Sequence, residues 1–205
     1  MRLGLFGGSF DPVHYGHLLL AECCREQCGL QQVWFLPAAV PPHKQDRTLS
    51  PAEARIEMLE LAVAGHPALA VHRYEVDRGG VSYTVDTLEH FRRQDAEREL
   101  FLLMGSDSLY DLPQWRQAAR ICELALPVVA CRPGAGPPDF ACLAGLASPQ
   151  RIEQIAQHQV EMPEIDLSSR EIRARVSQRR SIRYQTPRAV EEYIRTHRLY
   201  QRDSQ

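Results

Sequence analysis

Short apolar runs alternate with longer amphipathic stretches along most of the chain. Runs of about four to six residues have the length of strands, and they occupy positions 2–6, 32–36, 69–72, 99–104 and 127–130. The intervening segments favour helices at 16–27, 51–64 and 83–94, a helical stretch near 115–121, and two closing helices at 169–178 and 187–197. Alternating strands and helices are typical of a mostly parallel sheet that carries helices on both faces.

Prolines and glycines mark the ends of these elements. Gly29 follows the first helix and Pro37 stops the second strand. Ser50 and Pro51 predict a helix start, with the serine as N-cap and the proline at the first position. We therefore expect an α/β fold, a Rossmann-like open parallel sheet with helices on both faces, in one domain over 1–205. The segment from about 167 to 205 is expected to form a small C-terminal helical extension.

The bulk composition excludes several classes of function. The chain has 205 residues, 44% of them hydrophobic and 24% charged, as in ordinary globular proteins. A net charge of −2 gives no global field for nucleic acid or an anionic membrane. No stretch approaches the roughly 20 apolar residues of a membrane span, and Met1–Gly4 lacks the layout of a signal peptide. We expect a cytoplasmic protein without nucleic-acid or membrane partners.

The six cysteines show no paired C-x-x-C spacing. Cys24 and Cys28 are four residues apart on a predicted helix, but a structural zinc usually takes four ligands from two such pairs. We therefore expect free thiols, no disulfide framework and no protein-held metal.

The densest chemistry lies in residues 7–17, Gly-Gly-Ser-Phe-Asp-Pro-Val-His-Tyr-Gly-His, directly after the first strand. Glycines let a backbone approach an anion closely, and a helix start offers unpaired N–H groups and partial positive charge. His14 and His17 are three apart, so both project from one face of the first helical turn. A Gly-Gly turn or a histidine pair alone is more often structural. Together they predict a polyphosphate cradle.

Further polar residues follow other strands, at the edge where open α/β sheets bind ligands. Lys44 lies in a loop that is stiffened by prolines. It either neutralises a phosphate group or is an ordinary solvated lysine. Asp107, after the central strand, can accept hydrogen bonds from ribose hydroxyls. Ser168 and Ser169 either cap the next helix or bind phosphate there, with Arg173 as a bidentate clamp.

Residues 7–17 resemble the (T/H)xGH signature of the nucleotidyltransferase superfamily. Their longer form, GG(T/S)FDPxHxGH, is similar to that of the bacterial nicotinate mononucleotide adenylyltransferases, with Ser9 where threonine is frequent. Four further segments follow in the family's order: 41–44, PPHK; 82–88, SYTVDTL; Trp115; and 167–173, LSSREIR against ISSTxIR. Leu167 and Arg170 depart from that last pattern, and Arg170 removes its threonine hydroxyl.

The resemblance implies a nicotinate-nucleotide adenylyltransferase of NAD biosynthesis. Such an enzyme transfers AMP from ATP to nicotinate mononucleotide by direct in-line attack, with Mg²⁺, giving deamido-NAD and pyrophosphate. The implied catalytic residues are His14, His17, Lys44 and Arg173. The implied ATP-binding residues are Gly7, Gly8, Ser9, Phe10, Gly16, Gly105, Asp107, Ser168 and Ser169. The implied substrate-binding residues are Tyr83, Thr84, Trp115 and Lys44.

Several alternatives stay open at this point. The acceptor could be another phosphorylated compound, such as nicotinamide mononucleotide or phosphopantetheine, and a non-catalytic nucleotide-binding regulator is a third reading. Without the resemblance, Trp115 would be read first as a core residue. The sequence also leaves a homo-oligomer open.

Overall fold

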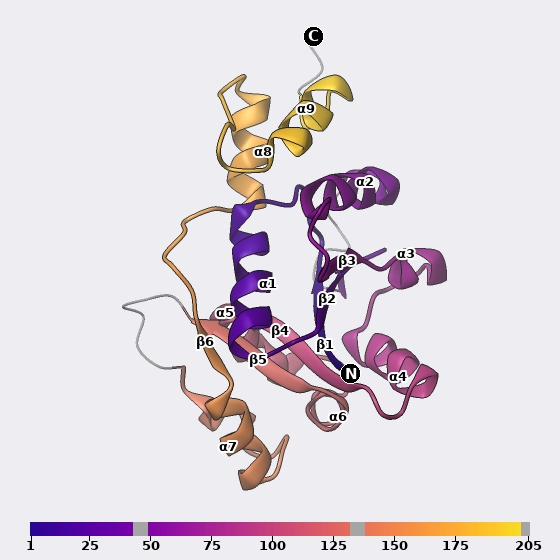
Figure 1. Cartoon of the computed structure of the whole chain (residues 1–205), viewed down its shortest axis with the longest axis vertical. Coiled ribbons are helices and arrows are strands. Elements are labelled where there is room, and N and C mark those ends of the chain that lie inside the picture. The colour runs from indigo at the N-terminus through magenta and orange to yellow at the C-terminus, as the bar shows by residue number, and fades with distance from the viewer. Residues whose placement is uncertain (43–48, 132–137, 202–205) are drawn as a thin grey trace.

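The computed structural model describes residues 1–42, 49–131 and 138–201, and its core is one sheet of six parallel strands (Figure 1). The strand order is β3-β2-β1-β4-β5-β6, which confirms the expected α/β fold. The strands are β1 (Arg2–Gly8), β2 (Gln32–Pro37), β3 (Leu69–Val71), β4 (Glu99–Gly105), β5 (Leu126–Cys131) and β6 (Gln159–Glu161).

Helices connect these strands and cover both faces of the sheet. The chain runs outward in one direction through β1, β2 and β3, then returns to β4 and continues in the other direction. Because parallel crossovers are right-handed, this reversal places α1 and α2 on one face and α4, α6 and α7 on the other. The helices are α1 (Tyr15–Gln27), α2 (Ala52–Val63), α3 (Tyr74–Arg78), α4 (Thr84–Gln94), α5 (Ser106–Asp111), α6 (Ala118–Leu124), α7 (Pro149–Gln157), α8 (Ser169–Ser177) and α9 (Arg188–Thr196).

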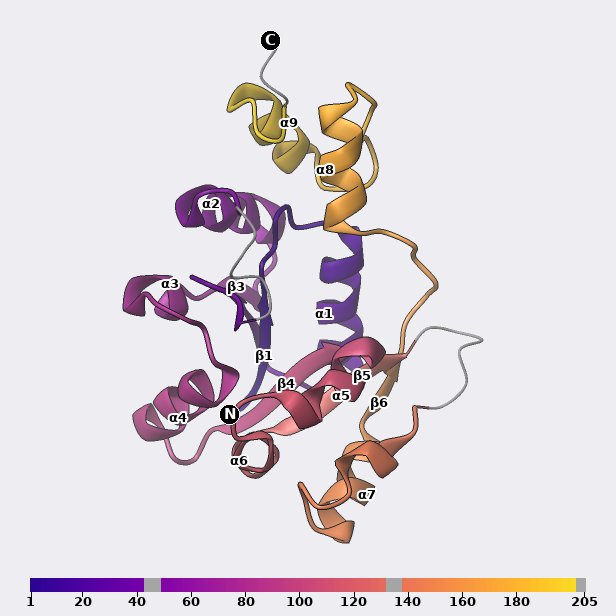
Figure 2. The same cartoon turned by 180° about the vertical axis from the view of Figure 1, so that it is seen from behind.

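The reversal opens a crevice between the two central strands. Pairing of β1 with β4 runs from Arg2 and Glu99 to Leu5 and Leu102. Beyond that register β1 pairs only with β2 as far as Gly8, whereas β4 pairs with β5 as far as Gly105. Figure 2 shows β4 and β5 from behind, where they run beside β1. A parting of strands at a topological switch point is where doubly wound sheets bind ligands.

Most predicted elements are confirmed, and the differences have local causes. The strand β6 was not predicted, because it is three residues long and only its Val160 is buried. The short α3 was also missed. Helix α7 was missed although Ser148 caps it through a bond from the Arg151 backbone N–H, with Pro149 at its first position.

Two predicted helix starts were wrong. Helix α2 begins at Ala52, and Ser50 is not its cap. The Ser50 backbone N–H donates to Asp11 Oδ2 at 3.3 Å, and its carbonyl accepts from Arg55 Nε at 3.1 Å. The helix expected near 115–121 begins at Ala118, because Trp115 has extended backbone angles after the short 3₁₀ turn Leu112–Gln114.

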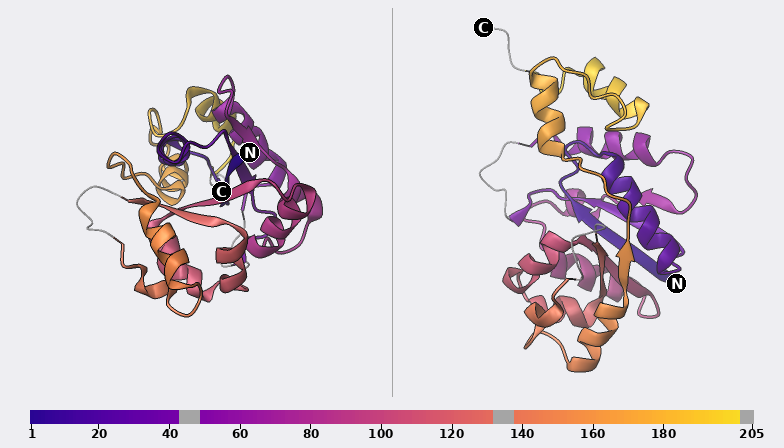
Figure 3. Two further views of the ribbon diagram at one scale, coloured as in Figure 1. Left: turned by 60° about the horizontal axis from the view of Figure 1, so that its bottom comes forward. Right: turned by 90° about the vertical axis from the view of Figure 1, so that its left-hand side faces the viewer.

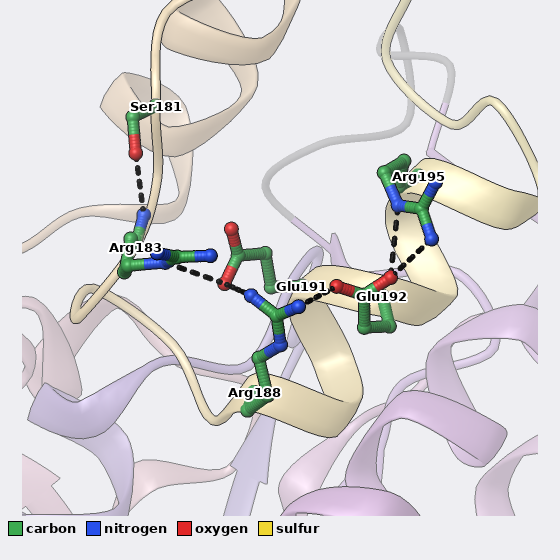
Figure 4. Close-up of polar contacts among 6 residues, drawn as sticks. All are labelled: Ser181, Arg183, Arg188, Glu191, Glu192 and Arg195. Carbon is green, nitrogen blue, oxygen red and sulfur yellow. Dashed lines mark hydrogen bonds and ion pairs between the residues drawn. The ribbon is translucent and has the colours of Figure 1, made fainter.

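The two closing helices form the expected extension at one end of the molecule (Figure 3). Helix α9 packs against α2, with Val190 and Ile194 buried, while Ile172 is the buried residue of α8. The outer side of α9 carries ion pairs from Arg188 and Arg195 to Glu192 (Figure 4). Exposed pairs of this kind add about 0–1 kcal/mol each, so apolar burial anchors the extension.

Candidate functional site

A sharply bent loop follows β1 and leads into α1. Phe10 adopts the left-handed backbone region, at φ 48°, and its ring is buried among Phe6, Phe35 and His17. A Cβ on Gly8 would lie 2.9 Å from Cζ of that immobile ring. Gly8 is therefore required by packing, and Phe10 can contact a nucleotide only through its backbone.

The two motif histidines stack on each other at the start of α1. Their ring centroids are 3.7 Å apart with an interplanar angle of 24°. His14 is the N-cap residue, and its backbone N–H donates to His17 Nδ1 at 3.2 Å. Because Nδ1 of His17 accepts, the proton of its neutral ring lies on Nε2. His17 is thus fixed as an Nε2–H donor.

His14 is buried, and its burial lowers the pKa to about 4. The ring is neutral at physiological pH as a result. Its Nδ1 has no hydrogen-bond partner within the described residues, which marks a polar atom placed for a ligand or a water. Gly16 makes room for this ring, because a Cβ there would lie 3.0 Å from Nδ1.

The start of α8 comes to the same loop from the far end of the chain. An Arg173 guanidinium nitrogen donates to the Asp11 carbonyl at 2.6 Å, and Ser169 Oγ donates to the Pro12 carbonyl at 2.8 Å. Ser168 accepts from the Glu171 backbone N–H at 3.2 Å and caps the helix. The structure therefore brings Arg173 and Ser169 to the histidine loop. Arg170 is exposed.

Sequence reasoning missed a second set of groups that hold the loop. Tyr200 donates to Asp11 Oδ1 at 2.6 Å, and Thr186 Oγ1 donates to the Val13 carbonyl at 2.8 Å. Arg55 is 1% exposed and donates to the Ser9 carbonyl at 3.0 Å. Burial lowers the pKa of Arg55, while nearby Asp11 raises it. Asp11 belongs to the recognised motif, but nothing local in the sequence pointed to its distant partners.

A cavity of about 520 Å³ opens where β1 and β4 part. Of the predicted residues, its described lining includes Gly7, Gly8, Ser9, Tyr83, Thr84 and Trp115. The histidines, Arg173 and the two serines of α8 are not part of that lining. Gly105 is the N-cap residue of α5, and Asp107 is exposed in its first turn, at the carboxyl end of β4. Lys44 lies outside the described residues.

Trp115 combines the two roles that the sequence left open. Its partly buried side chain packs against the hydrophobic core and also lines the cavity. Its Nε1 is buried without a hydrogen-bond partner in the described part of the chain. The indole N–H can only donate, so this buried group has an unused capacity for one hydrogen-bond acceptor.

A buried carboxyl group holds the wall that carries Tyr83 and Thr84. Glu75, on α3, accepts from Thr87 Oγ1 at 2.8 Å. Burial raises the pKa of Glu75, and hydrogen bonds from Thr87 and Ser82 oppose that change. Ser82 Oγ also accepts from the Ala39 backbone N–H at 2.9 Å, which ties the loop after β2 to the start of α4. Ser82 therefore links two loops and does not cap α4, whose N-cap is Tyr83.

Three further findings concern metal binding, disulfides and membranes. Among the described residues, no group of three or more His, Cys, Asp or Glu side chains could hold a metal ion. The six cysteines are free thiols, as expected. No helix in the parts of the chain that the structure describes is long and apolar enough to cross a membrane.

Comparison with known proteins gives consistent results. A cytidylyltransferase-like family model matches residues 5–175. A probable nicotinate-nucleotide adenylyltransferase of Thermomicrobium roseum is 47% identical over 97% of this chain and 91% of its own. The corresponding protein of Thermus thermophilus is 46% identical, over 98% and 100%. A solved Plasmodium falciparum nicotinic acid mononucleotide adenylyltransferase, complexed with NaAD, superposes with a TM-score of 0.78 over 97% of both chains. Its 16% identity establishes likeness of fold.

Proposed function

The chain belongs to the cytidylyltransferase-like family, as a nicotinate-nucleotide adenylyltransferase, and from this premise we propose how its own residues carry the reaction. The enzyme is a nucleotidyltransferase of NAD biosynthesis that joins ATP and nicotinate mononucleotide into deamido-NAD, with release of pyrophosphate. The observation that carries the residue assignment is the stacked histidine pair at the start of α1. The His17 ring lies 6.0 Å from the ring of Phe6, which lines the cavity between β1 and β4.

The chemistry is a direct in-line displacement at phosphorus. A phosphate oxygen of the mononucleotide forms a bond to the α-phosphorus of ATP while the bond from that phosphorus to pyrophosphate breaks. The nucleophile is already anionic at neutral pH, so no general base is needed. Catalysis then consists of positioning and of stabilising charge that develops on the phosphate oxygens.

Each basic group has a part in that stabilisation. His17 donates from Nε2 to the phosphate oxygen nearest the developing charge. The neutral His14 hydrogen-bonds the ATP phosphates, and Arg173 holds them with the guanidinium donors left after its bond to Asp11. Lys44 is assigned as a further phosphate-binding cation on its sequence position alone.

The remaining predicted residues divide between the two substrates. Gly7, Gly8 and Gly16 bring the backbone of the loop and of the start of α1 to the ATP phosphates, with further backbone contacts from Ser9 and Phe10. Gly105 and Asp107 face the ribose, and Ser168 and Ser169 complete the phosphate end. Tyr83 and Thr84 line the pocket of the mononucleotide, and Trp115 stacks on its flat pyridine ring.

A divalent metal ion is typical of nucleotidyl transfer from ATP, and we assign Mg²⁺. The described side chains provide no cage for a metal. This fits Mg²⁺, which usually binds through substrate phosphates and one or two carboxylates; Asp107, in the first turn of α5, is the candidate carboxylate. When bound, the ion neutralises charge on the leaving pyrophosphate. We place the enzyme in the cytosol, where its free thiols would stay reduced.

Pyrophosphate release in the presence of ATP and Mg²⁺ tests this function. Nicotinate mononucleotide, nicotinamide mononucleotide and phosphopantetheine should be run side by side. We expect a strong preference for nicotinate mononucleotide, with deamido-NAD as the product. Preference for another acceptor would reassign the substrate, and ATP binding without any product would favour a regulatory protein.

A further inference from the structure

The cavity is mostly apolar, and it carries few charged groups. Among its described lining residues, Arg116 supplies the one cation and Glu75 the one carboxyl group. Arg116 directly follows Trp115, and it lies on the wall formed with Tyr83 and Thr84. This wall presents aromatic side chains to the cavity, whereas the glycine loop after β1 presents mainly backbone.

The Arg116 guanidinium is held in place by two neighbours. Its Cζ lies 4.7 Å from the centroid of the Tyr83 ring, and one terminal nitrogen lies 3.7 Å from Asp86 Oδ2. The same Asp86 oxygen also receives Arg78, at 3.5 Å. One carboxylate is thus shared by two guanidinium groups, so Asp86 alone does not neutralise both Arg78 and Arg116. A cation stacked on an aromatic ring also loses little conformational freedom on binding an anion.

The substrate's chemistry requires such a charge. Nicotinate mononucleotide carries a carboxylate on its pyridine ring, where nicotinamide mononucleotide carries a neutral amide. Moving a carboxylate into an apolar cavity is costly unless a charged or hydrogen-bonding partner meets it. Arg116 has the planar donor pair that matches a carboxylate. The carboxyl group of Glu75 already accepts a hydrogen bond from Thr87 Oγ1 at 2.8 Å, so it is held on its own side of the cavity lining.

We propose that Arg116 is a specificity-determining residue, whose guanidinium pairs with the pyridine carboxylate and selects the acid over the amide. This inference rests on the proposed function and names the group that sets its acceptor. The guanidinium lies over the Tyr83 ring, which lines the same cavity, and the Asp86 carboxylate lies beside it. The amide oxygen can accept a hydrogen bond from the guanidinium, but the amide has no charge for it to neutralise and cannot accept the bidentate pair.

The test compares kcat/KM for the two mononucleotides in the wild type, in Arg116→Gln and in Arg116→Lys. Loss of a charge-assisted bidentate contact is worth roughly 10- to 100-fold, so we expect Arg116→Gln to lose that much with the acid and less than about threefold with the amide. Arg116→Lys, which keeps the charge, should lose less with the acid. The KM for ATP should not change.

The matched control is Arg120→Gln, four residues further along the chain, on α6. Arg120 pairs with Glu89 and Glu123 and is not part of the described cavity lining, so both substrates should behave as in the wild type. Calorimetric binding of each mononucleotide in the absence of ATP gives a second readout of selectivity, and it should show the same loss for the acid alone.

A purely structural role for Arg116 would lower turnover of both mononucleotides equally. An unchanged ratio of acid to amide in Arg116→Gln, with or without a general loss, therefore overturns the inference. The proposed function fails in a different way, through a wild type that makes no dinucleotide from either mononucleotide. The two failures are distinguishable because the first is a property of the variant and the second of the wild type.

Discussion

Tyr200 donates a 2.6 Å hydrogen bond to the carboxylate of Asp11, across a separation of 189 residues. The two residues join the C-terminal extension to the loop that carries the stacked histidines. Burial and the adjacent Asp11 carboxylate raise the pKa of Tyr200, so its hydroxyl stays protonated and keeps donating. The extension is therefore a structural support of the histidine loop, where we propose that the ATP phosphates bind.

Tyr200→Phe should weaken that connection without changing the shape of the side chain. Loss of a buried hydrogen bond to a carboxylate costs roughly 1–3 kcal/mol, and a looser loop should raise the KM for ATP several-fold. Urea unfolding and steady-state kinetics measure the two effects. Tyr184→Phe is the matched control, because Tyr184 lies in the same extension but is 84% exposed; equal losses in both variants would contradict the assignment.

His17→Ala should lower turnover by about 10²- to 10³-fold, the range for one preorganised donor to a developing oxyanion. The measurement is pyrophosphate release at saturating ATP and nicotinate mononucleotide, with circular dichroism to verify the fold. His158→Ala, at the C-terminal cap of α7 and outside the described cavity lining, serves as the control. Near-normal turnover in a folded His17→Ala would exclude the donor role.

The buried His14 should make the enzyme less stable in mild acid. Its folded pKa of about 4 lies below the ordinary value of 6.5, so the unfolded chain binds more protons between these values. The contribution of neutral His14 to the free energy of unfolding is complete above about pH 6.5 and is lost as the pH falls toward 4. The total loss is on the order of 3 kcal/mol. Urea unfolding from pH 7 to pH 4.5 should show a shallower pH dependence in His14→Gln than in the wild type. Identical slopes would mean that His14 is solvated.

Gly16→Ala should separate stability from activity. Alanine favours a helix interior over glycine by about 1 kcal/mol, but the new Cβ would lie 3.0 Å from His14 Nδ1 and 3.1 Å from Cε1. The His14 ring must shift by a few tenths of an ångström, which disturbs its stack with His17. We expect unfolding free energy within about 1 kcal/mol of the wild type and turnover lowered at least several-fold. A variant with full activity would show that the ring can yield.

Local sequence patterns were enough to predict the frame of the sheet. Leu100–Met104 is apolar because β4 is buried on both faces of the sheet. Gly8 correctly indicated the turn at the end of β1. The short β6 carries one buried side chain, so no periodicity could reveal it. A short strand at the edge of a sheet buries fewer side chains than a central strand, so its sequence shows less hydrophobic periodicity.

The site could be predicted only where its residues are adjacent in sequence. His14 and His17 share one helical turn, and their spacing indicated a common face. The loop's supports could not be found in this way, because Tyr200 and Thr186 reach it from the other end of the chain. Arg55 was hidden for a different reason: an arginine on a predicted helix is normally exposed, yet this one is buried to meet the carbonyls of Ser9 and Ser50.

The bond between Asp11 and Tyr200 also sets an order of events during synthesis. Loop residues 9–14 are made well before Thr186 and Tyr200, whose side chains anchor them. At about 5–20 residues per second, the intervening chain takes roughly 10 to 40 s to emerge from a ribosome. A nascent chain that has completed its central strands still lacks the anchors of its histidine loop. Nucleotide turnover should therefore begin only after the extension has been translated and has docked.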